Sequence, residues 1–403
     1  MARASLYWLR EKEMPELEIT FLMPCLNEEE TLEICIQRCL ASLDGLNLKG
    51  EVLISDNGST DSSYAIAKNH SDSRVRVIKT SSAGYGNALR AGIESALGKY
   101  VVMADADDSY ELERVSHFID KLEKGADLVM GNRFKGGIEP GAMPFLHKYL
   151  GNPVLSFIGR IFFKVPIGDF HCGLRAFRRQ SILNLNLVTP GMEFASEMVV
   201  KASKASLEIA EVPTRLRKDG RSRAPHLQTW NDGWRHLVFL LMQSPRWLFL
   251  YPGIVSLFSG ILGMVYTSKG TNNLNALSLD LNTFYCSMGA AILGTQLIQL
   301  GMIARIYFGN VGRGNSTPNS LATKLLSFFT LERGIILGFI SFLAGILIVL
   351  RLALSWKDSN FSYLPQETSL RVTGFALLLI IAGAQTIFSS FLAALVRSGS
   401  RNE

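Results

Sequence analysis

Hydrophobic and polar positions divide the chain into two regions of different character. Between residues 17 and about 135, short apolar runs alternate with segments in which apolar residues recur at helical spacing. The apolar runs predict strands at 18–23, 52–55, 75–80, 100–104 and 127–131. The segments between them predict helices at 29–43, 62–69, 85–97 and 111–123. This alternation predicts an α/β fold with a mostly parallel sheet and helices on both of its faces.

The second region contains four long apolar stretches, at about 248–267, 284–308, 334–354 and 373–396. Each approaches or exceeds the ~20 residues that a helix needs to cross a bilayer. Buried helices of a soluble protein fit poorly, because four such lengths in succession are rare there. We therefore predict four membrane spans. Their many small residues are compatible with assembly into a homo-oligomer.

The segments between these two regions mix apolar, aromatic and basic residues. An apolar helix is expected at 145–163, and its pattern suits a buried core helix and an element at the membrane surface equally well. The stretch around Trp230 and Trp234 predicts a helix that lies along the membrane. We therefore divide the chain into an N-terminal extension, an α/β domain, an interfacial helix and a transmembrane domain, at 1–16, 17–228, 229–246 and 247–403.

Composition agrees with a membrane protein that handles anionic molecules. Hydrophobic residues make up 48% of the 403 residues and charged residues 19%, and the formal net charge is +6. A positive protein beside anionic lipid suits anionic substrates. Nucleic acid is a poor alternative partner, because the sequence has no basic stripe interleaved with aromatic residues. The five cysteines lack metal-like spacing, so we expect them to be reduced.

The distribution of Lys and Arg predicts the orientation in the membrane. The segment between the second and third apolar stretches carries Arg313, Lys324 and Arg333, whereas the segment after the first stretch sets Lys269 against Asp280. By the positive-inside rule, both termini then face the cytoplasm. The N-terminus offers too few consecutive apolar residues for a secretory signal. We therefore expect a multi-pass protein of the cell inner membrane with its α/β domain in the cytoplasm.

Two carboxylates follow the apolar run at 100–104. Asp105 and Asp107 are one residue apart, and alternation at the end of a strand points both toward the same side. Carboxylate oxygens held in this way suit Mg²⁺ or Mn²⁺, usually shared with a substrate phosphate. An Asp-x-Asp pair is weak by itself, since most such pairs cap loops or lie in solvated turns.

Further polar residues follow the first two predicted strands. Asn27 and Glu28 come after the first strand, and Asp56 opens an Asn-Gly-Ser-Thr-Asp run after the second. Polar groups at successive strand ends in an α/β pattern indicate a ligand crevice. Taken by itself, the run at 56–61 is explained better by turn and helix-cap chemistry. Gly84 and Gly86 open a predicted helix, where their amides either face a phosphate or form a packing turn.

These motifs resemble those of a known family. Three are similar to motifs of the family 2 inverting glycosyltransferases, which have a GT-A fold: Pro24-x-x-Asn27-Glu28, Asp56-x-Gly58-Ser-Thr-Asp61 and Asp105-x-Asp107. Two more resemble the polyprenyl-phosphate branch, which includes dolichyl-phosphate mannose synthase and the GtrB-like glucosyltransferases: Gly131-Asn-Arg133-Phe134 and Asp169-Phe-His-Cys-Gly173-Leu-Arg175. Asn57 and Ser109 depart from the family, which often has Asp and Gln at these positions.

The resemblance implies transfer of one sugar from a UDP- or GDP-linked donor to a polyprenyl phosphate, with inversion at the sugar. Asp105 and Asp107 would hold Mg²⁺ or Mn²⁺ on the donor diphosphate. Arg133 and Arg175 would fork onto phosphate, with Asp169 orienting the acceptor or balancing the arginines. These three would form the catalytic group. The donor would lie against the remaining motif residues, Pro24, Asn27, Glu28, Asp56 and Asp105.

Three further residues are candidates for phosphate or acceptor contacts. In the basic run at 215–223, we expect Arg221 to bind the donor diphosphate and Arg223, together with Arg133, to bind the acceptor phosphate. Attraction to anionic lipid headgroups is the alternative. Glu197 lies on a predicted helix where the family has an acidic residue that supports the acceptor. A helix-surface pair with Lys201 is the alternative.

Two other functions stay open at this point. A processive polysaccharide synthase also joins a GT-A domain to membrane helices, and Gln243-Ser-Pro-Arg246-Trp247 matches the Gln-x-x-Arg-Trp motif of such enzymes. The motif at 169–175 favours single-sugar transfer over this alternative. A membrane scaffold with a non-catalytic nucleotide-binding domain is the second alternative, and the intact Asp105 and Asp107 argue against it.

Overall fold

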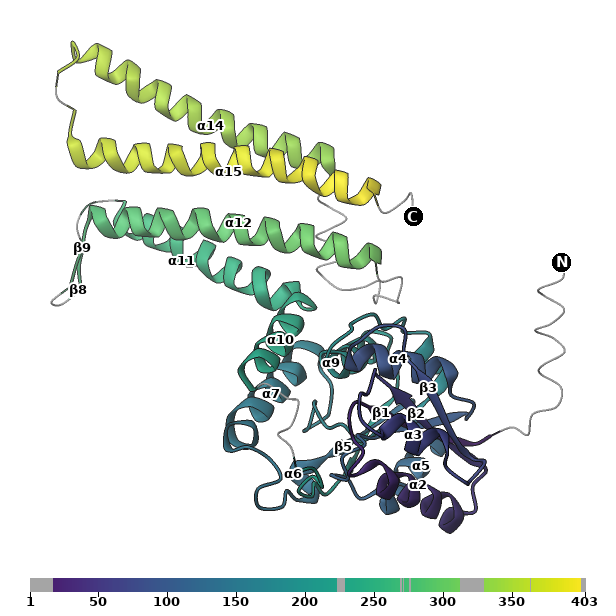
Figure 1. Ribbon diagram of the computed structural model, residues 1–403. Helices are drawn as coiled ribbons and strands as arrows, with labels where there is room; N and C mark the ends of the chain where they lie inside the picture. Colours follow the sequence, from purple (N-terminus) through teal and green to yellow (C-terminus); the bar gives the residue numbers. More distant parts are fainter. Residues whose placement is uncertain are drawn as a thin grey trace, which may run out of the picture. The chain divides into compact units, whose positions relative to one another are not determined.

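The computed structural model describes residues 17–222, 229–268, 270, 272–274, 277–311, 330–362 and 364–399. The chain separates into two compact units, one that ends at Gln243 and one that begins at Ser244. The first unit holds the α/β region and the second holds long helices (Figure 1).

The first unit is built on a seven-stranded sheet. Its strands are β1 (Ile19–Cys25), β2 (Gly50–Asp56), β3 (Val75–Lys79), β4 (Tyr100–Met103), β5 (Leu128–Asn132), β6 (Arg175–Arg178) and β7 (Ile209–Pro213). They lie in the order β3-β2-β1-β4-β6-β5-β7, and β6 is antiparallel to both β4 and β5. The other neighbours pair in parallel. The predicted mostly parallel sheet is therefore confirmed.

Helices cover both faces of this sheet, because its strands are apolar on both sides. On β1, Phe21 and Met23 belong to the core under α2 (Leu32–Leu46), α3 (Ser63–Lys68) and α5 (Ser116–Glu123). Leu22, between them, packs into the opposite core. That core is covered by α4 (Tyr85–Ser95), α7 (Asn152–Phe163), α8 (Arg179–Leu183), α9 (Phe194–Lys204) and α10 (Thr229–Met242).

The structure adds detail where the sequence pattern was weak. The expected helix at 111–123 is a short 3₁₀ turn (η1, Leu112–Arg114) followed by α5. The expected helix at 145–163 begins with a π-helical turn (η2, His147–Gly151) and continues as α7, preceded by a short α6 (Arg133–Gly136). Leu155 and Gly159 of α7 are buried, whereas Val154, Phe157 and Ile161 are exposed. This helix is thus half core and half exposed apolar surface.

Within the described residues, the second unit holds four helices that are long and apolar enough to cross a membrane, at Arg246–Thr267, Leu281–Tyr307, Leu331–Asp358 and Glu367–Ser398. They correspond to η3 (Arg246–Leu250) with α11 (Tyr251–Thr267), then α12 (Leu281–Val311), α14 (Leu331–Asp358) and α15 (Gln366–Gly399). A small hairpin, β8 (Asn272–Leu274) with β9 (Leu277–Leu279), lies between α11 and α12. The prediction of four spans is confirmed, and the chain is an integral membrane protein.

Small residues let these helices approach closely, as is usual in membranes. A Cβ on Gly260 of α11 would lie 2.4 Å from the backbone nitrogen of Ala291 on α12. A Cβ on Gly338 of α14 would lie 2.7 Å from the carbonyl oxygen of Gly383 on α15. Figure 1 shows the two resulting helix pairs running side by side.

Candidate active site

The two carboxylates that follow β4 have different hydrogen-bond partners. Asp105 Oδ1 accepts a hydrogen bond of 2.9 Å from the Tyr85 hydroxyl of α4. Its other oxygen faces Gly173, where a Cβ would lie only 2.4 Å away. Asp107 Oδ1 accepts bonds from the backbone and hydroxyl of Ser109, at 3.1 and 2.6 Å. The structure thus brings the two predicted metal ligands together with Tyr85, which sequence reasoning missed.

The electrostatic surroundings of Asp105 make it a weaker acid than an ordinary aspartate side chain. Burial, and then the negative charge of Asp107, raise its pKa to about 6, although the Tyr85 hydrogen bond and the charges of Arg221 and Arg133 oppose the shift. A buried carboxyl whose pKa is raised by a neighbouring carboxylate favours a positive partner. A carboxyl group whose pKa is shifted by burial and by a neighbouring charge is typical of a functional site.

Arg221 supplies positive charge at this edge. Its Nη2 lies 2.8 Å from Asp107 Oδ2 and 3.0 Å from Asp219 Oδ2, and its Nη1 lies 3.2 Å from Glu28 Oε1. Only 12% of its side chain is exposed. Burial would lower the pKa of Arg221, but Asp107 and Glu28 raise it. Glu28 and Arg221, predicted to bind the donor, therefore meet Asp107, predicted to bind the metal, although long stretches of sequence separate them.

The other residues predicted around the nucleoside shape the loops at this edge. Asn27 has a left-handed backbone (φ 57°), and its Oδ1 accepts a 2.7 Å bond from Thr60 N. Asp56 is 2% exposed and accepts bonds from the amides of Gly58 and Ser59. Pro24 is buried within β1 opposite Ser55. The turn-and-cap interpretation of the run at 56–61 describes these contacts well.

The glycine turn before α4 is a packing turn. Asn57 Oδ1, at the position where the family often has Asp, accepts a 2.9 Å bond from Gly84 N. Gly86 N donates to Pro190 O at 2.8 Å, and a Cβ on Gly84 would lie 2.4 Å from the same oxygen. These contacts fix the start of α4 and hence the position of Tyr85.

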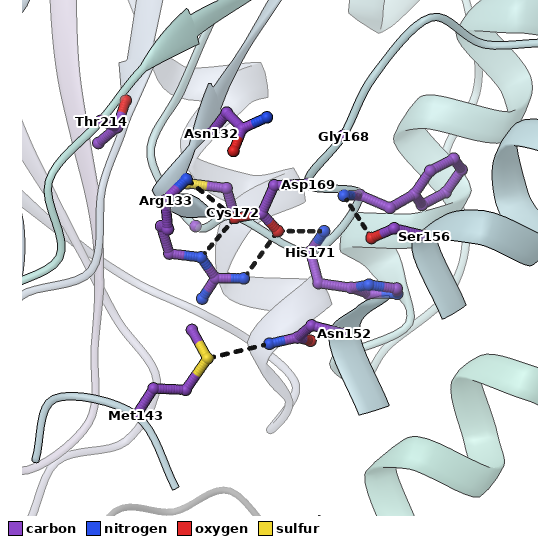
Figure 2. A network of polar contacts seen from close by, with 12 residues as sticks. Asn132, Arg133, Met143, Asn152, Ser156, Gly168, Asp169, His171, Cys172 and Thr214 are labelled. Carbon is purple, nitrogen blue, oxygen red and sulfur yellow. Dashed lines mark hydrogen bonds and ion pairs between the residues drawn. The ribbon is translucent and has the colours of Figure 1, made fainter. Parts of the chain in front are cut away.

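Arg133 and Asp169 form a buried ion pair at the end of β5. Figure 2 shows the guanidinium against the carboxylate, with Nε 2.6 Å from Oδ2 and Nη2 2.9 Å from Oδ1. Asp169 also accepts bonds from the amides of Arg133 and His171 and is 0% exposed. Of the two roles expected for Asp169, these contacts favour the balancing of an arginine over a contact with the acceptor.

Arg175 is fully buried, and its predicted contact with phosphate finds no support in the geometry. Its guanidinium donates to three backbone carbonyls, those of Cys172 at 2.8 Å, Phe170 at 3.4 Å and Ala195. These bonds tie the loop at 169–174 to the start of α9. Arg175 therefore acts as a structural clamp, because its donors already point at the backbone.

Glu197 is likewise engaged within the protein. It is 1% exposed and accepts bonds from the amides of Val188 and Thr189, from the Thr189 hydroxyl at 2.6 Å and from Lys201 Nζ at 2.8 Å. Burial would raise its pKa, but the bonds from Lys201 and Thr189 hold that pKa below its usual value. The predicted alternative, a pair with Lys201, is present in buried form, and the contact with the acceptor has no support here.

A serine and two histidines join the loop at 169–174 to α10. Ser196 Oγ lies 3.2 Å from His171 Nε2 and 2.9 Å from His236 Nδ1. Burial lowers the pKa of His171 well below its usual value and that of His236 to about 4. Sequence reasoning missed this cluster, because 25 and 40 positions separate its histidines from Ser196.

Arg223, predicted to bind the acceptor phosphate, lies outside the described residues.

Comparison with known proteins gives the family. Residues 20–185 match the model of glycosyl transferase family 2, and residues 302–397 match that of the glycosyltransferase family 2 C-terminal transmembrane region. The low-salt glycan biosynthesis hexosyltransferase Agl6 of Haloferax volcanii is 33% identical over 375 residues, which cover 93% of this chain and 88% of that protein. The chain belongs to glycosyltransferase family 2.

Other relatives of this family 2 glycosyltransferase are more distant. A dolichyl-phosphate hexose transferase of Haloferax volcanii is 28% identical over 201 residues, covering 50% of this chain and 83% of that protein. A crystal structure of glucosyl-3-phosphoglycerate synthase from Mycobacterium tuberculosis aligns with a TM-score of 0.45 at 22% identity, covering 57% of this chain and 80% of that one. The expected family is confirmed by the first set of matches.

Proposed function

We propose that the chain transfers a single sugar from a UDP- or GDP-linked donor to a polyprenyl phosphate, with inversion at the anomeric carbon. The observation that carries this proposal is the meeting of Asp105, Asp107, Glu28 and Arg221 at the carboxyl edge of the parallel strands, in a family 2 chain that has four membrane-length helices. The relative named as a dolichyl-phosphate hexose transferase supports a lipid phosphate as the acceptor.

Asp105 and Asp107 fit a divalent cation such as Mg²⁺ or Mn²⁺. Both offer carboxylate oxygens, and no side chain at Gly173 covers Asp105 Oδ2. Among the described residues, no group of three His, Cys, Asp or Glu side chains is arranged to hold a metal. The remaining ligands would be donor phosphates and water, which is usual for Mg²⁺. When bound, the cation would neutralise charge on the departing nucleoside diphosphate.

Arg221 is the residue best placed to bind the donor diphosphate. Its guanidinium already bonds three carboxylates, and phosphate oxygens present the same kind of acceptors. Tyr85 keeps the Asp105 carboxylate in place through its hydroxyl. Positioning of this kind supplies much of the catalysis in group transfer, because the reactants lose their freedom before the reaction begins.

The proposed reaction needs no strong base. An oxygen of the acceptor phosphate bonds to the anomeric carbon while the bond from that carbon to the donor diphosphate breaks on the opposite face. A lipid phosphate is largely ionised near pH 7, since its second pKa is ~6. The carboxylate of Asp169 is already hydrogen-bonded to Arg133 and to two backbone amides, so it is not placed to act as a base. An ionised acceptor phosphate does not need one. Arg133 and Asp169 then shape the acceptor side of the site.

The surface of the first unit supports a location at a membrane. Phe157 and Ile161 of α7 are 54% and 38% exposed, and Trp230 and Trp234 of α10 are 75% and 64% exposed. Exposed aromatic and aliphatic residues on two neighbouring helices suit the boundary between lipid and water. We place this unit on the cytoplasmic side of the inner membrane, on the strength of the Lys and Arg distribution.

The test of the function uses the full chain in detergent. A panel of nucleotide-sugars is supplied with undecaprenyl or dolichyl phosphate, with and without excess chelator, and the lipid product is identified by mass spectrometry and its anomeric configuration by NMR. One sugar per lipid phosphate, inverted and lost on chelation, is the expected result. A polymer would favour the processive synthase, and no lipid-linked product from any donor would overturn the proposal.

The orientation is tested in intact cells with a membrane-impermeant thiol reagent. A cysteine introduced beside Arg313, which lies outside the described residues, should stay unlabelled in a variant that lacks Cys286. A cysteine introduced beside Asn282, at the other end of α12, should be labelled. Labelling at Arg313 with protection at Asn282 would reverse the orientation.

A further inference from the structure

A short segment of backbone lies against the loop that carries the two aspartates. Residues 216–222, which we call the strap, follow β7. Gly220 N donates to Asp107 O at 3.0 Å, and Ser222 N donates to Glu30 Oε2 at 2.7 Å. These two bonds hold the strap on either side of the arginine between them, so the backbone fixes the point from which its side chain extends.

The side chain of Arg221 reaches from the strap to an aspartate that we expect to bind the metal. Its Nη2 donates to Asp107 Oδ2 at 2.8 Å, and the other oxygen of this carboxylate accepts from the amide and the hydroxyl of Ser109. Both oxygens of Asp107 therefore have a partner already. A metal ion that used Oδ2 would share it with the guanidinium, and two positive charges on one oxygen repel each other.

The contact between Arg221 and Asp107 can open without a change in the backbone. Only side-chain atoms make it, and 12% of each of the two side chains is exposed. Nε of Arg221 also donates to Asp219 Oδ2 at 3.0 Å. Because Asp219 belongs to the strap itself, a guanidinium that leaves Asp107 stays beside a carboxylate. Diphosphate oxygens offer the guanidinium forked hydrogen bonds in exchange for those that it gives up.

We propose that Arg221 is a tethered cation that occupies Asp107 until the diphosphate of the donor draws it away, so that metal and donor bind cooperatively. The identity of the donor rests on the proposed function. Before the donor binds, the guanidinium opposes a second cation at Asp107. When the guanidinium turns to the diphosphate, Asp107 Oδ2 becomes available as a metal ligand. One side chain thus links two binding events, and such a link acts equally in both directions.

The first test measures metal binding without any sugar transfer. The full chain in detergent is titrated with Mn²⁺, and free Mn²⁺ is followed by electron paramagnetic resonance. Without nucleotide, Arg221→Ala should bind Mn²⁺ about tenfold more tightly than the wild type, because the competing charge is gone. Arg217→Ala removes the same charge from the same strap, but this guanidinium pairs with Glu111, so its Mn²⁺ affinity should match the wild type. Unchanged affinity in Arg221→Ala, or an equal rise in both variants, would overturn the inference.

The second test looks for the opposite change at the donor. UDP and GDP are titrated into each protein in excess chelator, and binding is followed by calorimetry. Arg221→Ala should bind the preferred nucleoside diphosphate about tenfold more weakly, as expected for the loss of charge-assisted hydrogen bonds. With that nucleotide bound, the difference in Mn²⁺ affinity between the variant and the wild type should shrink. A difference of the same size with and without nucleotide would contradict the proposal, because the two ligands would then not be coupled through Arg221.

Chemical rescue separates a competing guanidinium from a disturbed fold. Methylguanidinium chloride, added well below denaturing concentrations, should bring the Mn²⁺ affinity of Arg221→Ala back toward that of the wild type, whereas tetramethylammonium chloride at the same ionic strength should not. Equal effects of the two salts would assign the change to screening and reject the competition. If Arg221→Ala melts well below the wild type, Arg221→Gln takes its place, because glutamine removes the charge and keeps a hydrogen-bond donor.

The same proteins distinguish this inference from the proposed function. Opposite changes in metal and nucleotide affinity, without transfer to any polyprenyl phosphate, would sink the proposed function and leave the tethered cation standing. Transfer by the wild type, with an unchanged Mn²⁺ affinity in Arg221→Ala, would do the reverse.

Discussion

Two clusters of charged residues lie at the carboxyl edge of one sheet, and they differ in the groups to which their side chains are hydrogen-bonded. The first contains Asp105, Asp107 and Arg221, and the guanidinium of this arginine, from a segment beyond β7, bonds to side-chain carboxylates. In the second, Asp169 and Arg175 are both 0% exposed and bonded to buried backbone groups. The first cluster can exchange partners without moving a strand, and the second cannot.

The difference teaches which charged residues can contact a substrate. Both clusters contain residues of the sequence motifs, yet the guanidinium of Arg221 bonds to side-chain carboxylates, whereas that of Arg175 bonds to backbone carbonyls. Breaking a buried ion pair by removing one partner is costly, because the other charge is left without compensation. Side chains of the second cluster are therefore expected to matter first for stability, and those of the first for the reaction.

The largest effect is expected for Asp107→Ala. The variant loses one of two oxygen donors for a cation and one anchor of Arg221, so sugar transfer should fall by about 100-fold or more while the melting temperature stays close to that of the wild type. Transfer is measured with saturating donor and lipid phosphate. Asp44→Ala, which removes an exposed carboxylate paired with Arg74, is the control and should retain activity. Full activity of Asp107→Ala would erase the proposed distinction between the clusters.

Asp169→Asn tests the second cluster through stability. It leaves the buried Arg133 without a countercharge and should lower the free energy of unfolding by about 3–5 kcal/mol. Urea titration followed by proteolysis of the first unit measures this change. Replacing both partners together, Arg133→Met with Asp169→Leu, should restore part of the stability but no activity. Lost transfer at unchanged stability would instead assign Asp169 to the substrate.

Arg221→Lys sharpens the comparison, because it preserves charge and removes geometry. A lysine cannot bridge Asp107 and Glu28 or fork onto a diphosphate, so activity should fall about tenfold with membrane association unchanged. Arg215→Lys, at a half-exposed residue that pairs with Glu139, should be nearly silent. Arg223→Lys extends the test to the predicted acceptor contact. Wild-type turnover at both 221 and 223 would leave only attraction to lipid headgroups.

A further prediction concerns the pH dependence of stability. His236 has a folded pKa of about 4, below the usual ~6.5 of the unfolded chain, so the unfolded state takes up a proton first as the pH falls. Stability should therefore decline between about pH 6.5 and pH 4, by up to ~1.4 kcal/mol per pH unit. His236→Gln should flatten this slope, and part of it should remain because the pKa of His171 is also lowered. His117→Gln, at an exposed site, should leave the slope as it is, and an identical slope in His236→Gln would reject the assignment.

Much of the fold was predictable from periodicity, and the exceptions have physical causes. The parallel strands read as apolar runs because both of their faces are covered. The antiparallel β6 was not predicted, because it is only four residues long and has an arginine at each end, Arg175 and Arg178. In sequence patterns, arginine is expected at exposed positions. In the structure, Arg175 is buried because backbone carbonyls satisfy its donors.

The candidate site was predictable only in part. Asp105 and Asp107 could be found, because a single residue separates them in the sequence at a strand end. The contact of Arg221 with Asp107 spans 114 positions, and no local pattern encodes it. For Glu197, the helix and the pairing with Lys201 were predicted from the sequence. Its hydrogen bonds from the amides of residues 188 and 189 depend on how the preceding loop folds back.

The place of β6 in the sheet has a consequence for the birth of the protein on the ribosome. Because β6 lies between β4 and β5, the centre of the sheet stays open until residue 178 has been made, and its edge until β7 is complete at residue 213. Domains generally fold as units as the chain emerges, amino-terminal units first. The first membrane-length helix begins at residue 246, only a short distance later. Completion of the sheet and insertion of the first helix are therefore nearly consecutive events, and a delay in the first would leave strand edges exposed while the chain is already bound to the membrane.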